Sequence, residues 1–308
     1  MKVLVLGASG FIGNGVAQAL VRAGHQILGQ TRSAERYERE FIRNEIEIVE
    51  SDPTKDDAWL SSLSTLDVIV DCLGGSAPIS TLSKELIQKV EERIRSGTGR
   101  HKTSSKLAYV WTSGVWLHGE DRWGFVTDGT QVTRAPSKVD WRPEVEDHLV
   151  DSEVVDGIVI RPGLVYGRSA SVTGLLFQEA VRGRIEWPTT LGARYATVHI
   201  DDLAELYVRV VEAHPLVKGL KLEASNSATE SVDLLIHQLS RLVGLGSEKV
   251  VYKEPETPFE IALSGTSVVR PTLARSLLGW TTRKPSLVDG LPGYFRAYVA
   301  HSQSSASS

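Results

Sequence analysis

Three glycines stand at intervals of three residues near the start of the chain, in the stretch GASGFIG at 7–13. They follow an apolar run at 2–6 and precede an amphipathic stretch at 13–24. Glycines between a strand and a helix allow a tight turn and let backbone amides approach a pyrophosphate. The pattern predicts a dinucleotide-binding loop, and the alternative is a turn that binds nothing. The residues expected to contact the cofactor are Gly7, Ser9, Gly10, Phe11, Ile12 and Gly13.

The second apolar run, 25–32, ends in the residues QTR. A carboxylate near this position binds a free ribose 2′-hydroxyl, but the run ends in Arg32 instead. A guanidinium pairs well with a 2′-phosphate. We therefore predict NADP(H) as the preferred cofactor, with NAD(H) as the second choice. The alternative is an exposed arginine at the end of a strand.

Polar or small residues also end the next three apolar runs of the first half. Asp52 ends the run 45–52 and is a candidate to bind the adenine amine or to cap the next helix. Leu73 and Gly74 end the run 67–75, where a cofactor can lie close. Thr112 and Ser113 come at the end of the run 107–114, at an edge where ligands bind in open α/β sheets. Ser113 is a candidate to hydrogen-bond a substrate carbonyl, unless it only begins a turn.

The elements that must position these residues alternate along the first half. Short apolar runs without alternation are typical of strands buried on both faces, and amphipathic stretches separate them. This order predicts an α/β fold with a doubly wound parallel sheet, of the Rossmann type, joined by right-handed crossovers. We expect strands at 2–7, 25–32, 45–52, 67–75, 107–114 and 156–163, and helices at 13–24, 33–42, 54–63, 81–97 and 137–152.

After Gly167 the alternation becomes looser. We predict a dinucleotide-binding domain of residues 1–166, to which residues 196–224 return. A small C-terminal substrate lobe would comprise 167–195 and 225–300, and the tail 301–308 would be disordered because it has little to bury. In this half we expect helices at 171–185, 201–214, 229–244 and 270–279, and strands at 195–200, 219–225 and 249–254.

The composition of the 308-residue chain excludes several classes of partner. A net charge of -4 and 41% hydrophobic residues favour neither a nucleic acid nor an anionic membrane. No apolar run reaches the ~18–20 residues that span a bilayer. Cys72 is the only cysteine, so no intrachain disulfide can form, which fits a cytoplasmic protein. No His or Cys spacing indicates a metal site.

Taken together, these motifs resemble the short-chain dehydrogenase/reductase superfamily, on the extended or atypical branch of NAD-dependent epimerase/dehydratase-like proteins. The resemblance implies an oxidoreductase that acts on a carbonyl or alcohol of a small metabolite. It also implies that Pro162 and Val165 lie beside the cofactor, and it is compatible with a homodimer through the helices that flank 107–114. The matching segments are GASGFIG, SD at 51–52, TSG at 112–114, RPGLVYG at 161–167, VHIDDLA at 198–204 and LLGW at 277–280.

The superfamily carries a catalytic tyrosine followed four residues later by a lysine, and none of the eight tyrosines here has that lysine. If Glu146 matches the glutamate that usually follows, Arg142 stands at the lysine position and Lys138 at the tyrosine position. Arg142 can hold the nicotinamide ribose, but its pKa above 12 prevents it from donating a proton. Lys138 can donate one if burial lowers its pKa. Alternatively, both belong to a solvated basic face.

Tyr166 in RPGLVYG is the first candidate for the proton donor, with Arg142 as the cation that would lower its pKa. His118 has a suitable pKa, although no spacing selects it. His199 and Asp201 are expected to be structural.

The sequence thus predicts an enzyme in which Ser113 polarises the substrate oxygen. The alternatives are an epimerase, or a dinucleotide sensor without catalysis. Three tryptophans are candidates to line an apolar substrate pocket: Trp116, Trp123 and Trp187.

Overall fold

The computed structural model describes residues 1–74, 78–97, 105–169 and 172–306, and the chain divides into two compact units. Unit 1 comprises 1–113, 141–160 and 204–222, and unit 2 comprises 114–140, 161–203 and 223–308. Three elements, β7, α6 and β12, run from one unit into the other. The sequence-based division placed 114–140 in the first domain, whereas the structure groups these residues with unit 2.

Unit 1 is built on a seven-stranded sheet whose strand order is β12, β7, β5, β4, β1, β2, β3. Every pairing described from β7 to β3 is parallel. The predicted Rossmann-type α/β fold is confirmed. The strands are β1 Lys2–Leu6, β2 Gln26–Thr31, β3 Ile46–Glu50, β4 Val68–Asp71, β5 Ala108–Thr112, β7 Asp156–Pro162 and β12 Lys221–Ala224.

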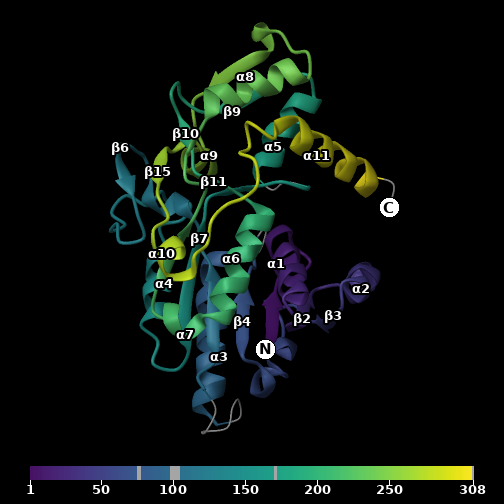
Figure 1. The fold of residues 1–308 in the computed structure, drawn as a ribbon, viewed down its shortest axis with the longest axis vertical. Coiled ribbons are helices and arrows are strands. Elements are labelled where there is room, and N and C mark those ends of the chain that lie inside the picture. The colour runs from purple at the N-terminus through teal and green to yellow at the C-terminus, as the bar shows by residue number, and fades with distance from the viewer. Residues whose placement is uncertain (75–77, 98–104, 170–171, 307–308) are drawn as a thin grey trace. The chain divides into compact units, whose positions relative to one another are not determined.

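Helices cover both faces of this sheet. Figure 1 shows α1 and α6 on the face turned to the viewer. His25, which follows α1, places its Nε2 3.3 Å from Oε1 of Glu212 at the end of α6. Apolar side chains of α3 and α4, such as Leu86 and Leu149, bury Ile69 and Tyr109 of the sheet in one core. The helices are α1 Phe11–Arg22, α2 Ala34–Arg43, α3 Ile79–Arg95, α4 Arg142–Val150, α6 Ile200–Glu212 and α7 His214–Val217, with 3-10 turns η1 Ala58–Leu60 and η2 Leu63–Thr65.

The chain reverses its direction of winding between β3 and β4, so the adjacent strands β1 and β4 belong to opposite halves of the sheet. The loops that leave two such strands diverge at their carboxyl ends, and ligands bind in the crevice that this opens. The glycine-rich loop follows β1, and Leu73 and Gly74 follow β4. The topology therefore places both predicted cofactor-binding segments at this point.

Unit 2 contains four two-stranded sheets: β10 with β13, β11 with β8, β14 with β9, and β15 with β6. Its strands are β6 Asp121–Val126, β8 Leu164–Tyr166, β9 Ile185–Pro188, β10 Arg194–Tyr195, β11 Thr197–His199, β13 Glu230–Ser231, β14 Val250–Lys253 and β15 Ser267–Val269. Its helices are α5 Val172–Val181, α8 Val232–Leu242, α9 Pro258–Ser264, α10 Leu273–Leu278 and α11 Leu291–Ala306, with η3 Val115–His118 and η4 Ser247–Lys249.

Three sequence-based expectations differ from the structure. The predicted helix 54–63 is replaced by the turns η1 and η2, because Asp56 accepts hydrogen bonds from the amides of Asp52 and Ala58 and holds the chain in turns. The helix expected from 137 begins only at Arg142, since Pro143 suits the first turn of a helix. The tail expected to be disordered is helical as far as Ala306, while 307–308 lie outside the described residues.

Candidate active site

The glycine-rich loop has a conformation that requires two of its glycines. Gly7 has φ 73, a left-handed value that favours glycine, and a Cβ there would lie 3.1 Å from the carbonyl oxygen of Cys72. A Cβ on Gly13 would lie 2.2 Å from the carbonyl oxygen of Gly7, so only glycine fits in this position. The loop therefore packs tightly against the segment that follows β4.

Gly10 has a different environment, because a Cβ there would meet only the Gly7 carbonyl oxygen, at 3.2 Å. Gly10 precedes α1, and no side chain caps the start of this helix. Phe11 and Ile12 form its first, half-buried turn. Free amides at a helix start beside an exposed glycine fit a pyrophosphate group. The residues present thus suit the phosphates of a dinucleotide.

The end of β2 lies next to this loop. The Thr31 hydroxyl donates to the Ser9 hydroxyl at 3.3 Å, and the amide of Gly7 donates to the side chain of buried Gln30 at 2.9 Å. Arg32 follows Thr31 and is exposed. No ion pair of Arg32 is found within the part of the chain that the structure describes. Its guanidinium is therefore available to a ligand.

Glu50 was not identified from the sequence. It pairs with Thr31 across the β2–β3 ladder, and its Oε1 accepts a hydrogen bond from the amide of Ala34 at 2.9 Å. The Glu50 carboxylate thus lies at the start of α2, which begins two residues after Arg32. The sequence indicated no carboxylate at this place. A parallel pairing of β2 with β3 places the end of 45–52 beside the end of 25–32. This expected pairing is the feature of the sequence that could have identified Glu50.

Asp52 forms a turn. Its Oδ1 accepts hydrogen bonds from the hydroxyl and the amide of Thr54, and its Oδ2 lies 3.1 Å from the ammonium of Lys55. The hydroxyl of Thr54, more than any other group, lowers the pKa of Asp52. Asp52 therefore holds a turn and caps no helix, because the helix expected at 54–63 is absent, and its contact with adenine stays a prediction.

A buried polar network lies beneath the ends of β4 and β5. Thr112 donates its hydroxyl to the carbonyl oxygen of Asp71 at 2.6 Å, so the Tyr207 hydroxyl, 2.7 Å away, donates to Thr112. Asp71 accepts from the Tyr109 hydroxyl at 2.9 Å and from the Leu73 amide at 3.0 Å. Burial raises the pKa of Asp71 to about 6. The Thr112 hydroxyl is therefore used internally, and any cofactor contact of this residue must come from its other atoms.

Ser113 and Arg142 lie together at the end of β5. The Arg142 guanidinium places one terminal nitrogen 3.5 Å from the Ser113 hydroxyl, at the outer limit of a hydrogen bond. Its carbon lies 5.3 Å from the ring centre of Trp141 and 5.9 Å from that of Trp111, which are cation–π distances. Burial lowers the pKa of Arg142 to about 10, below the expected limit of 12, yet the group is still a cation at neutral pH.

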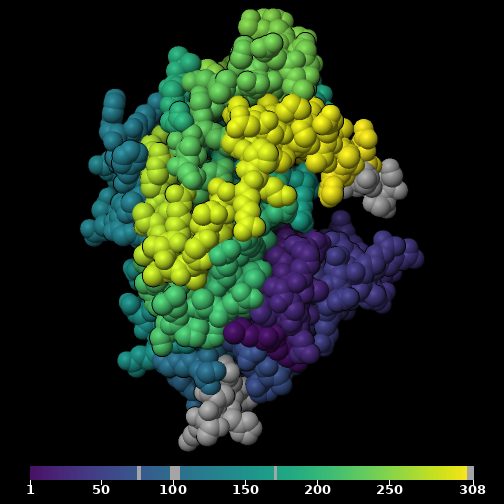
Figure 2. Space-filling model, viewed as in Figure 1, coloured from purple at the N-terminus to yellow at the C-terminus, as the bar shows by residue number. Residues whose placement is uncertain are grey.

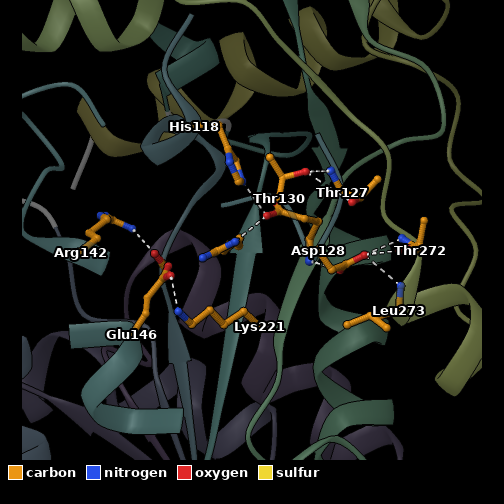
Figure 3. Close-up of polar contacts among 12 residues, drawn as sticks. His118, Thr127, Asp128, Thr130, Arg142, Glu146, Lys221, Thr272 and Leu273 are labelled. Carbon is orange, nitrogen blue, oxygen red and sulfur yellow. Dashed lines mark hydrogen bonds and ion pairs between the residues drawn. The ribbon is translucent and has the colours of Figure 1, made fainter. Parts of the chain in front are cut away.

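Glu146, on the same helix as Arg142, supplies a negative charge next to the Arg142 guanidinium. Its carboxylate is fully buried and interacts electrostatically with Arg142, and it lies 3.8 Å from the ammonium of Lys221. Figure 3 shows the side chains of Arg142 and Lys221 both pointing toward Glu146. Arg142 begins α4, one turn before Glu146, whereas the sequence-based expectation placed it inside a helix that starts at 137. Lys138 lies four residues earlier in an exposed turn, as the solvated alternative expected.

Tyr166 does not have the environment of a proton donor. Its side chain is fully buried, its hydroxyl donates to the carbonyl oxygen of Pro285 at 2.8 Å, and it accepts from the side-chain amide of Asn226 at 3.2 Å. Burial raises the pKa of Tyr166, where the sequence-based hypothesis required a lower one. Packing against residues far along the chain therefore makes Tyr166 structural. Pro162 and Val165, from the same segment, are buried in unit 2, and their contact with a cofactor stays a prediction.

His118 is also part of a buried structure in unit 2. Its Nε2 lies 2.7 Å from Glu223, which is fully buried and 3.0 Å from Arg161. Asp128 accepts from the Glu223 amide at 2.7 Å and from the backbone of Thr272, as Figure 3 shows. These contacts hold the segment after β5 and give no access to His118.

The tryptophans do not form the expected apolar pocket. Trp187 is buried and donates to Tyr195, Trp116 packs against Phe259, and Trp123 is 97% exposed. A separate pocket of ≈ 520 Å³ lies in unit 2 and combines charged side chains with a largely apolar lining. It is lined by Arg122 and Arg134 and by Glu120 and Glu254, among others.

Fold, glycine-rich loop and polar edge together define a Rossmann-type dinucleotide-binding protein. Residues 3–90, from β1 into α3, match the NAD dependent epimerase/dehydratase family. This match confirms the resemblance drawn from the sequence motifs, and the family is one of enzymes. No curated protein sequence matches the chain significantly.

Solved structures resemble the chain over almost its whole length, at low sequence identity. A dTDP-glucose 4,6-dehydratase of Bacillus anthracis in complex with NAD has a TM-score of 0.81 and 14% identity, with 98% of each chain covered. A UDP-glucuronic acid 4-epimerase of Bacillus cereus, in complex with UDP-glucuronic acid and NAD, has a TM-score of 0.78 and 18% identity, covering 98% of this chain and 99% of that one. A UDP-glucose 4-epimerase of Thermotoga maritima has a TM-score of 0.75 and 20% identity, covering 98% of this chain and 100% of that one. They show the fold.

Proposed function

We propose that the protein is an NADP(H)-preferring enzyme of the epimerase/dehydratase type, which oxidises or reduces a carbonyl or alcohol of a small metabolite. The observation that carries this proposal is the Ser113–Arg142 pair at the carboxyl end of β5, in the same unit as the glycine-rich loop. A bound dinucleotide supplies the hydride chemistry, and the protein supplies position and charge. The solved relatives bind nucleotide sugars, so these head the list of substrates to test.

The roles of the two residues follow from their chemistry. The Ser113 hydroxyl donates a hydrogen bond to the substrate oxygen and stabilises the charge that develops there. Arg142 keeps this edge of the sheet positive and donates hydrogen bonds, as the family lysine would. Because neither an arginine nor a serine is a good acid at neutral pH, and Lys138 lies in an exposed turn, the proton comes from water or from the substrate itself.

The preference for NADP(H) is supported by Arg32, which is exposed beside the glycine-rich loop and has no ion pair among the described residues. The dehydratase of Bacillus anthracis and the epimerase of Bacillus cereus named above contain NAD, and the Glu50 carboxylate accepts from the nearby Ala34 amide, so titration with both cofactors tests the preference. The homodimer also stays a prediction. No helix among the described residues is long and apolar enough to cross a bilayer.

A second candidate is a dinucleotide sensor without catalysis. It is favoured by one observation, namely that α4 carries no phenol and that Tyr166 is enclosed. The test incubates the protein and cofactor with nucleotide sugars, aldehydes, ketones and enones. It follows the absorbance of the reduced cofactor and also separates the products by chromatography, because an epimerase or dehydratase regenerates its cofactor in each turnover and gives no net change in absorbance. Turnover of any of these that is lost in Ser113→Ala supports the enzyme. Tight cofactor binding without turnover across the panel supports the sensor.

A further inference from the structure

Three contacts define the surroundings of the adenosine end of the predicted cofactor site. The Thr31 hydroxyl reaches Ser9 in the glycine-rich loop at 3.3 Å, and Glu50 is the partner of Thr31 in the next strand. The Glu50 carboxylate accepts from the Ala34 amide at 2.9 Å. Arg32 lies between Thr31 and this amide along the chain. A carboxylate from β3 therefore lies at the start of α2, two residues along the chain from Arg32, beside the end of β2 where a ribose 2′-substituent is recognised in this fold.

Glu50 is accessible to a ligand. It is exposed at the carboxyl end of β3, the edge strand of the seven-stranded sheet. Figure 2 shows the surface of α2 and β3, in indigo, uncovered on the face turned to the viewer. No ion pair between Glu50 and an arginine is found among the described residues, so its negative charge is not neutralised by a neighbour.

We infer that Glu50 is a specificity-determining residue that opposes Arg32 in the choice between the two cofactors. Its carboxylate accepts a hydrogen bond from a free ribose 2′-hydroxyl but repels a 2′-phosphate, whereas Arg32 attracts the phosphate. Glu50 therefore lowers the ratio of the NADH to the NADPH dissociation constant below the ratio that Arg32 alone would produce. This inference rests on the proposed function, because it needs a dinucleotide at the glycine-rich loop.

Glu50→Gln is a clean test, because the amide oxygen can still accept from Ala34 while the charge is lost. The dissociation constants of NADPH and NADH are measured by titration of intrinsic tryptophan fluorescence in the full-length protein. The ratio of the NADH to the NADPH constant should rise by about tenfold or more in Glu50→Gln. Glu50→Asp, which keeps the charge, should leave the ratio near that of the wild type.

Glu47→Gln is the matched control, because it removes the same charge from an exposed position three residues earlier on β3. It should leave the ratio unchanged. A ratio in Glu50→Gln no higher than in Glu47→Gln overturns the inference while leaving the proposed function intact. If the wild type binds neither dinucleotide, the proposed function fails, and the inference fails with it.

Discussion

Arg32 is the residue on which the expected cofactor preference depends. Arg32→Ala should weaken NADPH binding by about 1–3 kcal/mol, the range for a charge-assisted hydrogen bond, and leave NADH binding nearly unchanged. Titration calorimetry measures both. Arg43→Ala is a suitable control, because it removes the same charge from the far end of α2. An equal loss in both variants would show that only the overall charge matters.

Tyr166 has a different role from the one that its sequence position indicated. Because its buried hydroxyl donates to Pro285, Tyr166→Phe should lower the free energy of unfolding by about 1 kcal/mol and leave turnover nearly unchanged. Urea denaturation and steady-state kinetics on the same sample separate the two effects. A fall in turnover of about 10² or more at unchanged stability would restore Tyr166 as the proton donor.

Which residues could be predicted depended on how local their signal was. The glycine spacing, Arg32 and Ser113 are read from short motifs, and the structure places each at the carboxyl edge of the sheet in unit 1. Glu50 and Tyr166 depend on contacts that are distant in sequence, with Ala34 and Pro285 respectively. No short motif records such contacts, so an available carboxylate was missed and an enclosed phenol was taken for an available one.

At the scale of elements, the glycines between β1 and α1 have two different roles. Gly10 is expected to face the ligand, whereas Gly7 and Gly13 are required by the backbone conformation and packing of the turn. Gly10→Val should abolish dinucleotide binding and leave the fold intact, because little surrounds the new side chain. Circular dichroism and cofactor titration check both statements. Gly13→Val, in contrast, should destabilise the protein, because its Cβ would lie 2.2 Å from a carbonyl oxygen. Retained binding in Gly10→Val would mean that the loop is only a turn.

The buried carboxyl group of Asp71, at the end of β4, should make the free energy of unfolding depend on pH. Burial raises the native pKa of Asp71 to about 6, above the usual 3.8 of an aspartate, so the folded state holds more protons between these pH values. Its stabilising contribution is therefore present below about pH 4 and lost as the pH rises through about 6. Relative to Asp71→Asn, the wild type should lose about 3 kcal/mol of unfolding free energy between pH 4 and 7. Denaturation curves at several pH values test this, and parallel profiles would contradict it.

Two differences between the predicted and observed helices, at 54–63 and at α11, have physical causes. The spacing of apolar residues predicts a helix at 54–63, but the carboxylates of Asp52 and Asp56 accept hydrogen bonds from local amides and favour turns. The helix α11 was missed, although Leu291, Tyr294, Phe295 and Tyr298 recur at helical intervals and pack in one core. A search for this periodicity would have found it.

At the scale of the whole molecule, fold and substrate are specified by different parts of the chain. Alternating apolar runs predicted the sheet of unit 1, and solved structures at 14–20% identity share the fold over 97% or more of this chain. The many short strands of unit 2 leave little periodicity in the sequence. The substrate therefore could not be predicted from the sequence, and the pocket of unit 2 does not by itself identify it.

Under the proposed function, Arg142 and not Lys138 at the tyrosine position sustains the chemistry. The most direct measurement compares kcat/KM of Arg142→Met and Lys138→Met on the first substrate found, at saturating cofactor. Arg142→Met should lower it by about 10² to 10³, the range for a lost electrostatic contact with the reacting oxygen, and Lys138→Met should leave it close to the wild type. Loss of activity in Lys138→Met with near-normal activity in Arg142→Met would contradict the account.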